Sequence, residues 1–323
     1  MPSGSISRRH ATYVKTQKSK LKKFLYSKKI IRNYDLYLLI LPVIIFYAIF
    51  CYGPMYGLQL AFKDFMAVRG ITGSPWIGFD HFQRFFGSPY FTRLITNTVS
   101  ISALQLLFGF PIPIILALMI NEVGNVHIKK MTQNITYIPY FLSVVVIVGM
   151  LKNFVHPDHG IINIIVERLG GTRMDFMQEA SWFRPLYVGS GVWQSAGWNS
   201  IIFIAALAGV DPQLHESAKI DGAGRFQRIW HINIPTVLPT IIIVLILNVG
   251  AMMNIGFEKA FLMQNDLNLS TADIIPTYSY RVGIQGAQYS YATAVSFFNS
   301  VINCTLLVSI NSISRRINST SLW

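Results

Sequence analysis

The chain has 323 residues, of which 52% are hydrophobic and only 13% are charged, whereas about a quarter of the residues are charged in an average soluble domain. This composition excludes an ordinary soluble enzyme or binding domain as the first interpretation and favours a membrane protein. The net charge of +13 would also suit a nucleic-acid partner, but the positions of the charges along the chain indicate membrane topology instead.

Residues 1–34 form a basic arm with ten Lys and Arg and no acidic residue. No apolar stretch begins before Leu36, so the arm lacks the early apolar core of a secretory signal, and we predict that it is retained. Two interpretations stay open. Apolar residues between positions 24 and 31 are typical of an interfacial helix held to anionic membrane lipid. A solvated tail that satisfies membrane topology explains the charges equally well.

Six apolar segments follow, each close to the roughly 20 residues that cross a bilayer as a helix. They predict an all-α membrane protein with a six-helix transmembrane domain in residues 35–323. Pro42 is tolerated in the first span because neighbouring helices satisfy the freed carbonyl, and Pro111 and Pro113 predict a kink in the second. The expected spans are residues 36–57, 94–120, 135–151, 186–210, 237–257 and 292–313.

The distribution of charge predicts the orientation of these spans. With six spans, one side holds the basic arm, the segments 121–134 and 211–235, and the carboxyl tail. Seventeen of the 27 Lys and Arg lie on that side with five acidic residues, and ten lie on the other side with nine. Because excess Lys and Arg mark the cytoplasmic face, both termini are predicted to be cytoplasmic. The net charge is therefore explained by topology, and no nucleic-acid partner is predicted.

A polar, charged segment between the fourth and fifth spans differs from everything around it. Glu216 to Ala218 suit the start of a helix, and Gly222 permits a turn or the close approach of another chain. Pro235 suits the first turn of the next helix, where its missing N–H has no cost.

This segment resembles the cytoplasmic loop of binding-protein-dependent ABC importer permeases. Their pattern is Glu-Ala-Ala, three residues, Gly, nine residues, Ile, one residue and Leu-Pro. The positions in register are Glu216, Ala218, Gly222, Ile232 and Pro235, while Ser217 and Ile234 are small replacements. The run Asp221-Gly222-Ala223 resembles the carbohydrate branch of the family. The general run of the chain is similar to importers of oligosaccharides and polysaccharide fragments, alginate importers among them.

The resemblance implies a permease subunit in a bacterial inner membrane that imports a carbohydrate without catalysis of its own. Residues 211–235, here named the coupling segment, would form a helix that docks into a separate ATPase and couples its closure to alternating access. The residues expected to make this contact are Glu216, Ser217, Ala218, Asp221, Gly222 and Ala223. The chain lacks a phosphate-binding loop, so ATP and Mg²⁺ are expected on a dimer of ATPase partners. A second permease subunit, usually a different chain, and an extracytoplasmic solute-binding protein complete the expected assembly.

Polar residues inside the spans are candidates for the substrate pathway, because a polar group in hydrocarbon needs a partner or a cavity. The set comprises Asn97, Gln105, Gln194, Asn199, Asn248, Asn254, Asn299 and Asn303, with Trp193 and Trp198 as rings for sugar stacking. For each residue, hydrogen bonding between helices is the alternative explanation. The hypothesis singles out Asn199, Trp193, Trp198, Asn248 and Asn254.

Other classes of function receive less support from the sequence. His156, Asp158 and His159 are read as a solvated loop, and no metal site is predicted. No paired acids or nucleophile and base indicate an enzyme. A secondary transporter driven by an ion gradient remains the alternative, although such a protein would need ionisable residues at mid-membrane, and the expected spans contain almost none.

Overall fold

The computed structural model describes residues 33–318, so most of the basic arm lies outside the described residues. The chain divides into two compact units between Gln59 and Leu60, and each is described by itself. Residues 33–318 form helices and turns without a strand, apart from a single bridge between Lys63 and Trp76. The all-helical class is therefore confirmed.

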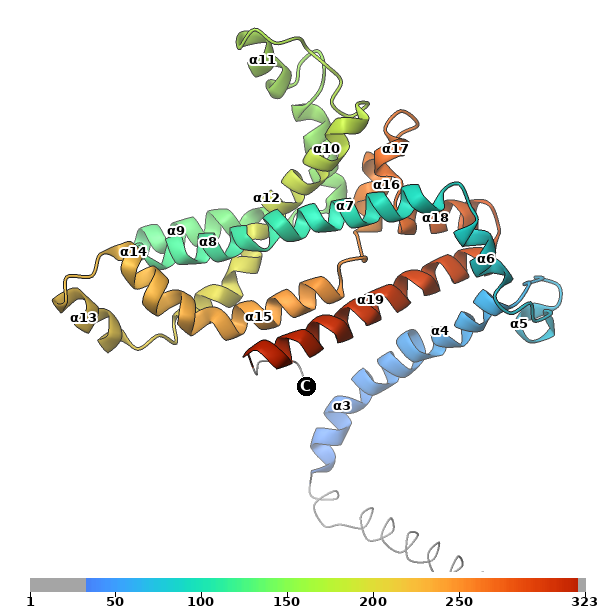
Figure 1. Ribbon diagram of the computed structural model, residues 1–323, viewed down its shortest axis with the longest axis horizontal. Coiled ribbons are helices and arrows are strands. Elements are labelled where there is room, and N and C mark those ends of the chain that lie inside the picture. Colours follow the sequence, from blue (N-terminus) through green and yellow to red (C-terminus); the bar gives the residue numbers. More distant parts are fainter. Residues whose placement is uncertain (1–32, 319–323) are drawn as a thin grey trace, which may run out of the picture. The chain divides into compact units, whose positions relative to one another are not determined.

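The helices are numbered here in chain order, with η marking 3-10 or π-helical turns (Figure 1). The first unit holds α3 (Tyr34–Phe46), η1 (Tyr47–Tyr52), α4 (Gly53–Met55) and the start of η2 (Tyr56–Phe62). The second unit holds α5 (Gly70–Gly73), α6 (Asp80–Phe86), α7 (Phe91–Gly109), α8 (Pro111–Asn121), α9 (Val126–Tyr137), η3 (Ile138–Phe141), α10 (Val144–Phe154), α11 (Ile161–Arg168), α12 (Ala180–Leu207), α13 (Pro212–Ile220), α14 (Arg225–Arg228), η4 (Ile229–Asn233), α15 (Ile234–Gly250), α16 (Phe257–Met263), α17 (Leu269–Ala272), α18 (Ile275–Tyr280), η5 (Arg281–Gln285) and α19 (Tyr289–Asn318).

Four helices in the described residues are long and apolar enough to cross a membrane. They are Tyr34–Phe62, Phe91–Asn121, Arg225–Gly250 and Tyr289–Arg316. A fifth span results if the bent pair Val126–Phe141 and Val144–Phe154 is counted as one. The predicted count of six is therefore confirmed only to four or five.

The expected third span, residues 135–151, contains a sharp break. The helices on its two sides meet at 99°. The Ser143 hydroxyl accepts a hydrogen bond from the Val146 N–H at 3.3 Å and starts a new helix. Pro139 lies in the preceding 3-10 turn and cannot donate a backbone hydrogen bond. An apolar run therefore did not produce one continuous helix here.

The expected fourth span, residues 186–210, overlaps α12, which has 28 residues but is not among the apolar candidates. The helix contains Gly, Ser and amide residues and packs against α7, α8 and α15. At Gly197 the absence of a side chain allows the Thr136 carbonyl of α9 to approach closely. Because α12 contacts other helices as well as lipid, a less apolar composition is tolerated in this helix.

A single residue, Phe110, separates α7 from α8 just before Pro111 and Pro113, and it keeps a helical conformation at φ −86° and ψ −48°. Prolines at these positions cannot donate to the preceding turn, but Phe91–Asn121 continues as one long helix, so the kink stays a prediction. This junction lies opposite α12 and leaves Gly109 and Phe110 facing the space between the helices.

A network of hydrogen bonds and ion pairs centred on Asp273 connects α7 with α18 and η5. Asp273 is fully buried, and its Oδ2 accepts from Nη2 of Arg93 at 3.0 Å and of Arg281 at 2.7 Å. Asn97 donates to the carbonyl oxygens of Ser270 and Asp273 and accepts from Arg184 at 3.0 Å. The buried carboxylate is therefore paired with two cations, the condition under which a buried charge is tolerated.

Candidate functional site

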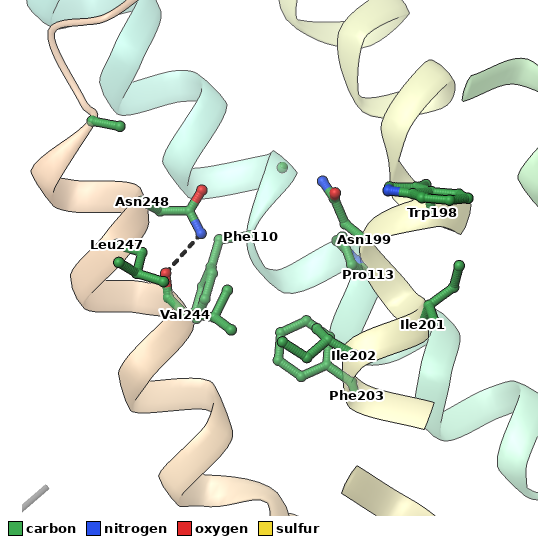
Figure 2. Close-up of a pocket in the computed structure, with 12 residues that line it drawn as sticks. Phe110, Pro113, Trp198, Asn199, Ile201, Ile202, Phe203, Val244, Leu247 and Asn248 are labelled. Carbon is green, nitrogen blue, oxygen red and sulfur yellow. Dashed lines mark hydrogen bonds between the residues drawn. The ribbon is translucent and has the colours of Figure 1, made fainter. Parts of the chain in front are cut away.

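A cavity of about 580 Å³ lies between α12, α15 and the junction of α7 with α8. Figure 2 shows Asn199 of α12 and Asn248 of α15 projecting from facing helices into this space, with Phe110 and Val244 below them. The rest of the wall is largely apolar. A concave, apolar wall with a few polar groups is typical of a small-molecule site.

A second, more polar cavity of about 270 Å³ adjoins the first and shares Asn199 and Asn248 with it. Each helix contributes one face, because residues three or four apart lie on the same side of a helix. From α12 these are Gly191, Ser195 and Asn199. Ser102 and Gln105 line the same cavity from α7.

Several of these polar side chains are open to a ligand. The side-chain amides of Gln105, Asn199 and Asn254 make no hydrogen bond to any residue in 33–318, and the amide of Asn248 donates only to the Val244 carbonyl at 2.8 Å. Side-chain amides offer both donors and acceptors, so the wall can bond sugar hydroxyls in either direction. The arrangement suits the hydroxyl groups of a saccharide.

The residues singled out for the substrate pathway do not all lie together. Asn199, Trp198 and Asn248 line the larger cavity, and Asn254 lines the adjoining one. Trp193 lines a separate, apolar pocket with Phe108 and Val188. The ring of Trp198 already stacks on Tyr140 with centroids 4.6 Å apart, so one of its faces is covered.

The remaining amides inside the spans connect helices. Gln194 donates to the Leu142 carbonyl at 3.0 Å, and Asn299 donates to the Met253 carbonyl at 3.3 Å. Asn303 accepts from the Met253 N–H at 2.9 Å. The sequence alone could not show which amides bond another segment and which line the cavity. The spacing of Gly191, Ser195 and Asn199 by four residues was the available signal, and it was missed.

In the coupling segment, α13 begins at Pro212, four residues before Glu216, where the sequence suggested a start. The Asp211 carboxylate accepts a hydrogen bond from the Gln213 N–H at 2.9 Å and caps the helix, with Pro212 in its first turn. The expectation that Glu216 to Ala218 begin the helix was wrong because the Asp-Pro pair is the stronger start signal.

Gly222 ends the same helix in the left-handed region, at φ +80°. The Gly222 N–H donates to the Lys219 carbonyl at 3.1 Å, and the Ala223 N–H donates to the Ala218 carbonyl at 2.8 Å. This pair of bonds is the Schellman motif, which favours glycine because a side chain is strained at this φ. The glycine of the family pattern thus has a local structural role.

The candidate coupling residues lie on an accessible surface. Glu216, Ser217, Asp221 and Gly222 are exposed, and Ala218 and Ala223 are half-buried.

Two large apolar side chains that sequence reasoning did not single out lie beside them. Ile220 is 87% exposed and Phe226 is 88% exposed. Exposed apolar side chains beside charged residues are typical of a surface that binds another protein.

Pro235 lies in the first turn of α15 (Ile234–Gly250), as the sequence predicted. The turns of α14, the π-helical turn Ile229–Asn233 and α15 follow one another without a break from Arg225 to Gly250. A π-helical turn accommodates a residue that cannot donate the regular backbone bond. The Asn233 side chain is fully buried in this turn and has no hydrogen-bond partner in the described residues.

The described residues contain no cluster of three or more His, Cys, Asp or Glu side chains able to hold a metal ion. The rings of His156 and His159 stack with centroids 3.8 Å apart in the loop after α10.

Residues 109–319 match the family described as "Binding-protein-dependent transport system inner membrane component". The chain belongs to this family and is an inner-membrane permease component of a binding-protein-dependent transport system. Family membership replaces the alternative of an ion-gradient transporter.

Two relatives from Bacillus subtilis (strain 168) are similar over almost the whole chain. Protein LplB is 44% identical over 90% of this chain and 92% of its own. The polygalacturonan/rhamnogalacturonan transport system permease protein YteP is 40% identical over 91% of this chain and 92% of its own.

A solved structure is similar to a comparable degree. It is the crystal structure of a bacterial alginate ABC transporter in complex with an alginate pentasaccharide-bound periplasmic protein. One of its chains matches with a TM-score of 0.84 and 42% identity, over 92% of this chain and 99% of that chain.

Proposed function

We propose that this permease imports acidic oligosaccharides, the fragments of uronic-acid polysaccharides, in an ATP-driven reaction. One observation carries the proposal. Cavity amides with open hydrogen-bonding positions occur in a chain 40% identical to a polygalacturonan/rhamnogalacturonan permease and 42% identical to a chain of an alginate transporter. Each sugar of such a polymer presents hydroxyl groups and a carboxylate, and amide donors and acceptors can bond the hydroxyl groups.

The proposed topology has six spans with both termini in the cytoplasm. The four candidate spans are joined by two more. One is α12, whose composition is less apolar than that of the candidates, and the other is the bent pair of helices around Ser143. Burial of α12 against α7, α8 and α15 supports its inclusion, because a helix surrounded by protein does not need an apolar surface on every side.

In this proposal the coupling segment docks into a cleft of a separate ATPase. Ile220 and Phe226 would supply apolar contact area, and Glu216 and Asp221 would meet cationic side chains of the partner. ATP and Mg²⁺ bind to the ATPase dimer. A second permease chain provides the other coupling segment, and a periplasmic binding protein delivers the saccharide.

The substrate is tested with the whole reconstituted complex. ATP hydrolysis is measured with the binding protein alone and with the binding protein plus tetragalacturonate, an alginate tetrasaccharide or a neutral tetrasaccharide. We expect an acidic saccharide to stimulate hydrolysis and the neutral one to leave it at the basal rate. Stimulation by the neutral saccharide alone would overturn the proposed substrate class.

The coupling role is tested by two variants, Glu216→Lys and Gly222→Asp. We expect both chains to insert in the membrane at normal levels while saccharide uptake is lost and no longer follows ATP hydrolysis. Glu258→Lys is the matched control, because Glu258 is an exposed carboxylate in α16, outside the coupling segment. Wild-type uptake in both coupling variants would contradict the assignment.

A further inference from the structure

Lys259 is a buried cation in α16, outside the candidate spans. Its side chain is packed between α16 and α12, and the residue is only 7% exposed. The ammonium Nζ donates a hydrogen bond to the Tyr187 carbonyl at 2.8 Å and lies 4.8 Å from the centroid of the Tyr187 ring. Both contacts favour the charged form of the side chain.

In residues 33–318, no carboxylate oxygen lies within 4 Å of Nζ, whereas Asp273 pairs with two arginines and Glu167 with one. Burial lowers the pKa of Lys259 to about 8, so most of the side chains remain charged at neutral pH. A buried charge without a counter-ion costs stability, and such a charge beside a cavity is typical of a functional site.

The position of Nζ connects it with the polar cavity. Gly191 of α12 lines that cavity, and a Cβ on Gly191 would lie 3.2 Å from the Lys259 Nζ. The same Cβ would lie 3.8 Å from Nε2 of Gln105, which also lines the cavity. The Lys259 ammonium therefore lies beside the part of the cavity wall that Gly191 and Gln105 form.

We propose that the Lys259 ammonium is the counter-charge for a substrate carboxylate at the edge of the cavity beside Gly191. The proposal rests on the acidic saccharide proposed above and assigns its recognition to one atom. Amides such as Asn199 and Gln105 would bond the hydroxyl groups that acidic and neutral sugars share. Lys259 would then select the acidic ones.

The direct test is equilibrium binding to the solubilised complex without the binding protein. The probes are tetragalacturonate and the neutral tetrasaccharide obtained by reducing its carboxyl groups. We expect the wild-type complex to prefer the uronate. Lys259→Met should lower uronate affinity about 10-fold, as for the loss of a hydrogen bond to a charged group, and leave the neutral affinity unchanged. Lys259→Arg should retain most of the preference.

A second variant leaves the lysine in place. Gly191→Ala puts a methyl group between Nζ and the cavity, so it should reduce uronate affinity more than neutral affinity. Gly189→Ala is the matched control on the same helix, because a Cβ there meets nothing within 4 Å. This pair keeps the lysine itself and so tests recognition even if Lys259→Met impairs folding.

The outcomes separate this inference from the proposed function. Equal losses for uronate and neutral saccharide in Lys259→Met would indicate a structural role and overturn the inference. The inference is also overturned if the wild-type complex binds uronate and neutral saccharide equally well while a uronate-loaded binding protein still stimulates ATP hydrolysis. That result would leave the proposed substrate class intact. If that stimulation is also absent, the proposed function fails as well.

Discussion

The Asp273 network and the coupling segment are stabilised in opposite ways. Asp273 is buried, and its partners Arg93 and Arg281 come from separate elements of the chain. The helix of the coupling segment is held by its own ends, through the Asp211 cap and the bonds around Gly222. Two large apolar side chains of the segment, Ile220 in α13 and Phe226 in α14, remain exposed.

The difference indicates which region has its interactions satisfied within this chain and which region leaves a surface open for another chain. A buried charge must find its partners during folding, so the Asp273 network depends on the tertiary structure of this polypeptide. Local caps need no tertiary partner, so both ends of α13 are satisfied by nearby residues while the helix presents an open surface. Such a surface is suited to a partner chain. Removing the buried charge and removing the local caps should therefore have effects of different size and extent.

The largest effect is expected for Asp273→Ala. Arg93 and Arg281 would be left side by side without their carboxylate, and loss of one partner from a buried ion pair costs about 3–5 kcal/mol. We expect a lower midpoint of thermal unfolding for the purified complex and less folded protein in the membrane. Asp266→Ala is the control, because Asp266 is exposed and makes no ion pair in the described residues. Equal stability of the two variants would contradict the central role of Asp273.

A smaller and local effect is expected for Gly222→Ala. A side chain in the left-handed region costs about 1–2 kcal/mol, and this cost acts on the end of α13 only. Hydrogen exchange should become faster for the amide protons of Gly222 and Ala223, while the midpoint of unfolding stays unchanged.

Gly224→Ala serves as the control for this glycine, because Gly224 has φ −69°, which alanine adopts without strain. Gly222→Asn should exchange more slowly than Gly222→Ala, since asparagine tolerates the left-handed region better. Equal protection in Gly222→Ala and Gly224→Ala would show that the Schellman motif is not the reason for the glycine.

The smallest effect is expected for Asp211→Ala, which removes the cap at the other end of α13. Loss of an N-cap costs about 1 kcal/mol. Hydrogen exchange should become faster in the first turn of α13, and coupled ATP hydrolysis should fall only slightly. Asp211→Ser keeps an acceptor at the cap and should restore most of the protection. A fall in global stability comparable to that of Asp273→Ala would erase the contrast between the two regions.

The sequence by itself determined the membrane class, most of the apolar segments and the polar segment at residues 211–235. These properties depend on runs of apolar residues and on short patterns such as Glu216 to Gly222, which act between near neighbours in the chain. The glycine at 222 is an example, because its need for a left-handed conformation arises within one helix end.

Only the tertiary structure decided which polar residues face a cavity and which connect helices. Asn199 and Gln194 lie on the same helix, yet one projects into the cavity and the other bonds Leu142 of a different segment. The meeting of Lys259 with Gly191 and of Arg93 with Asp273 joins positions far apart in the chain. Such pairs depend on how helices cross, and the crossing is set by packing rather than by spacing along the sequence.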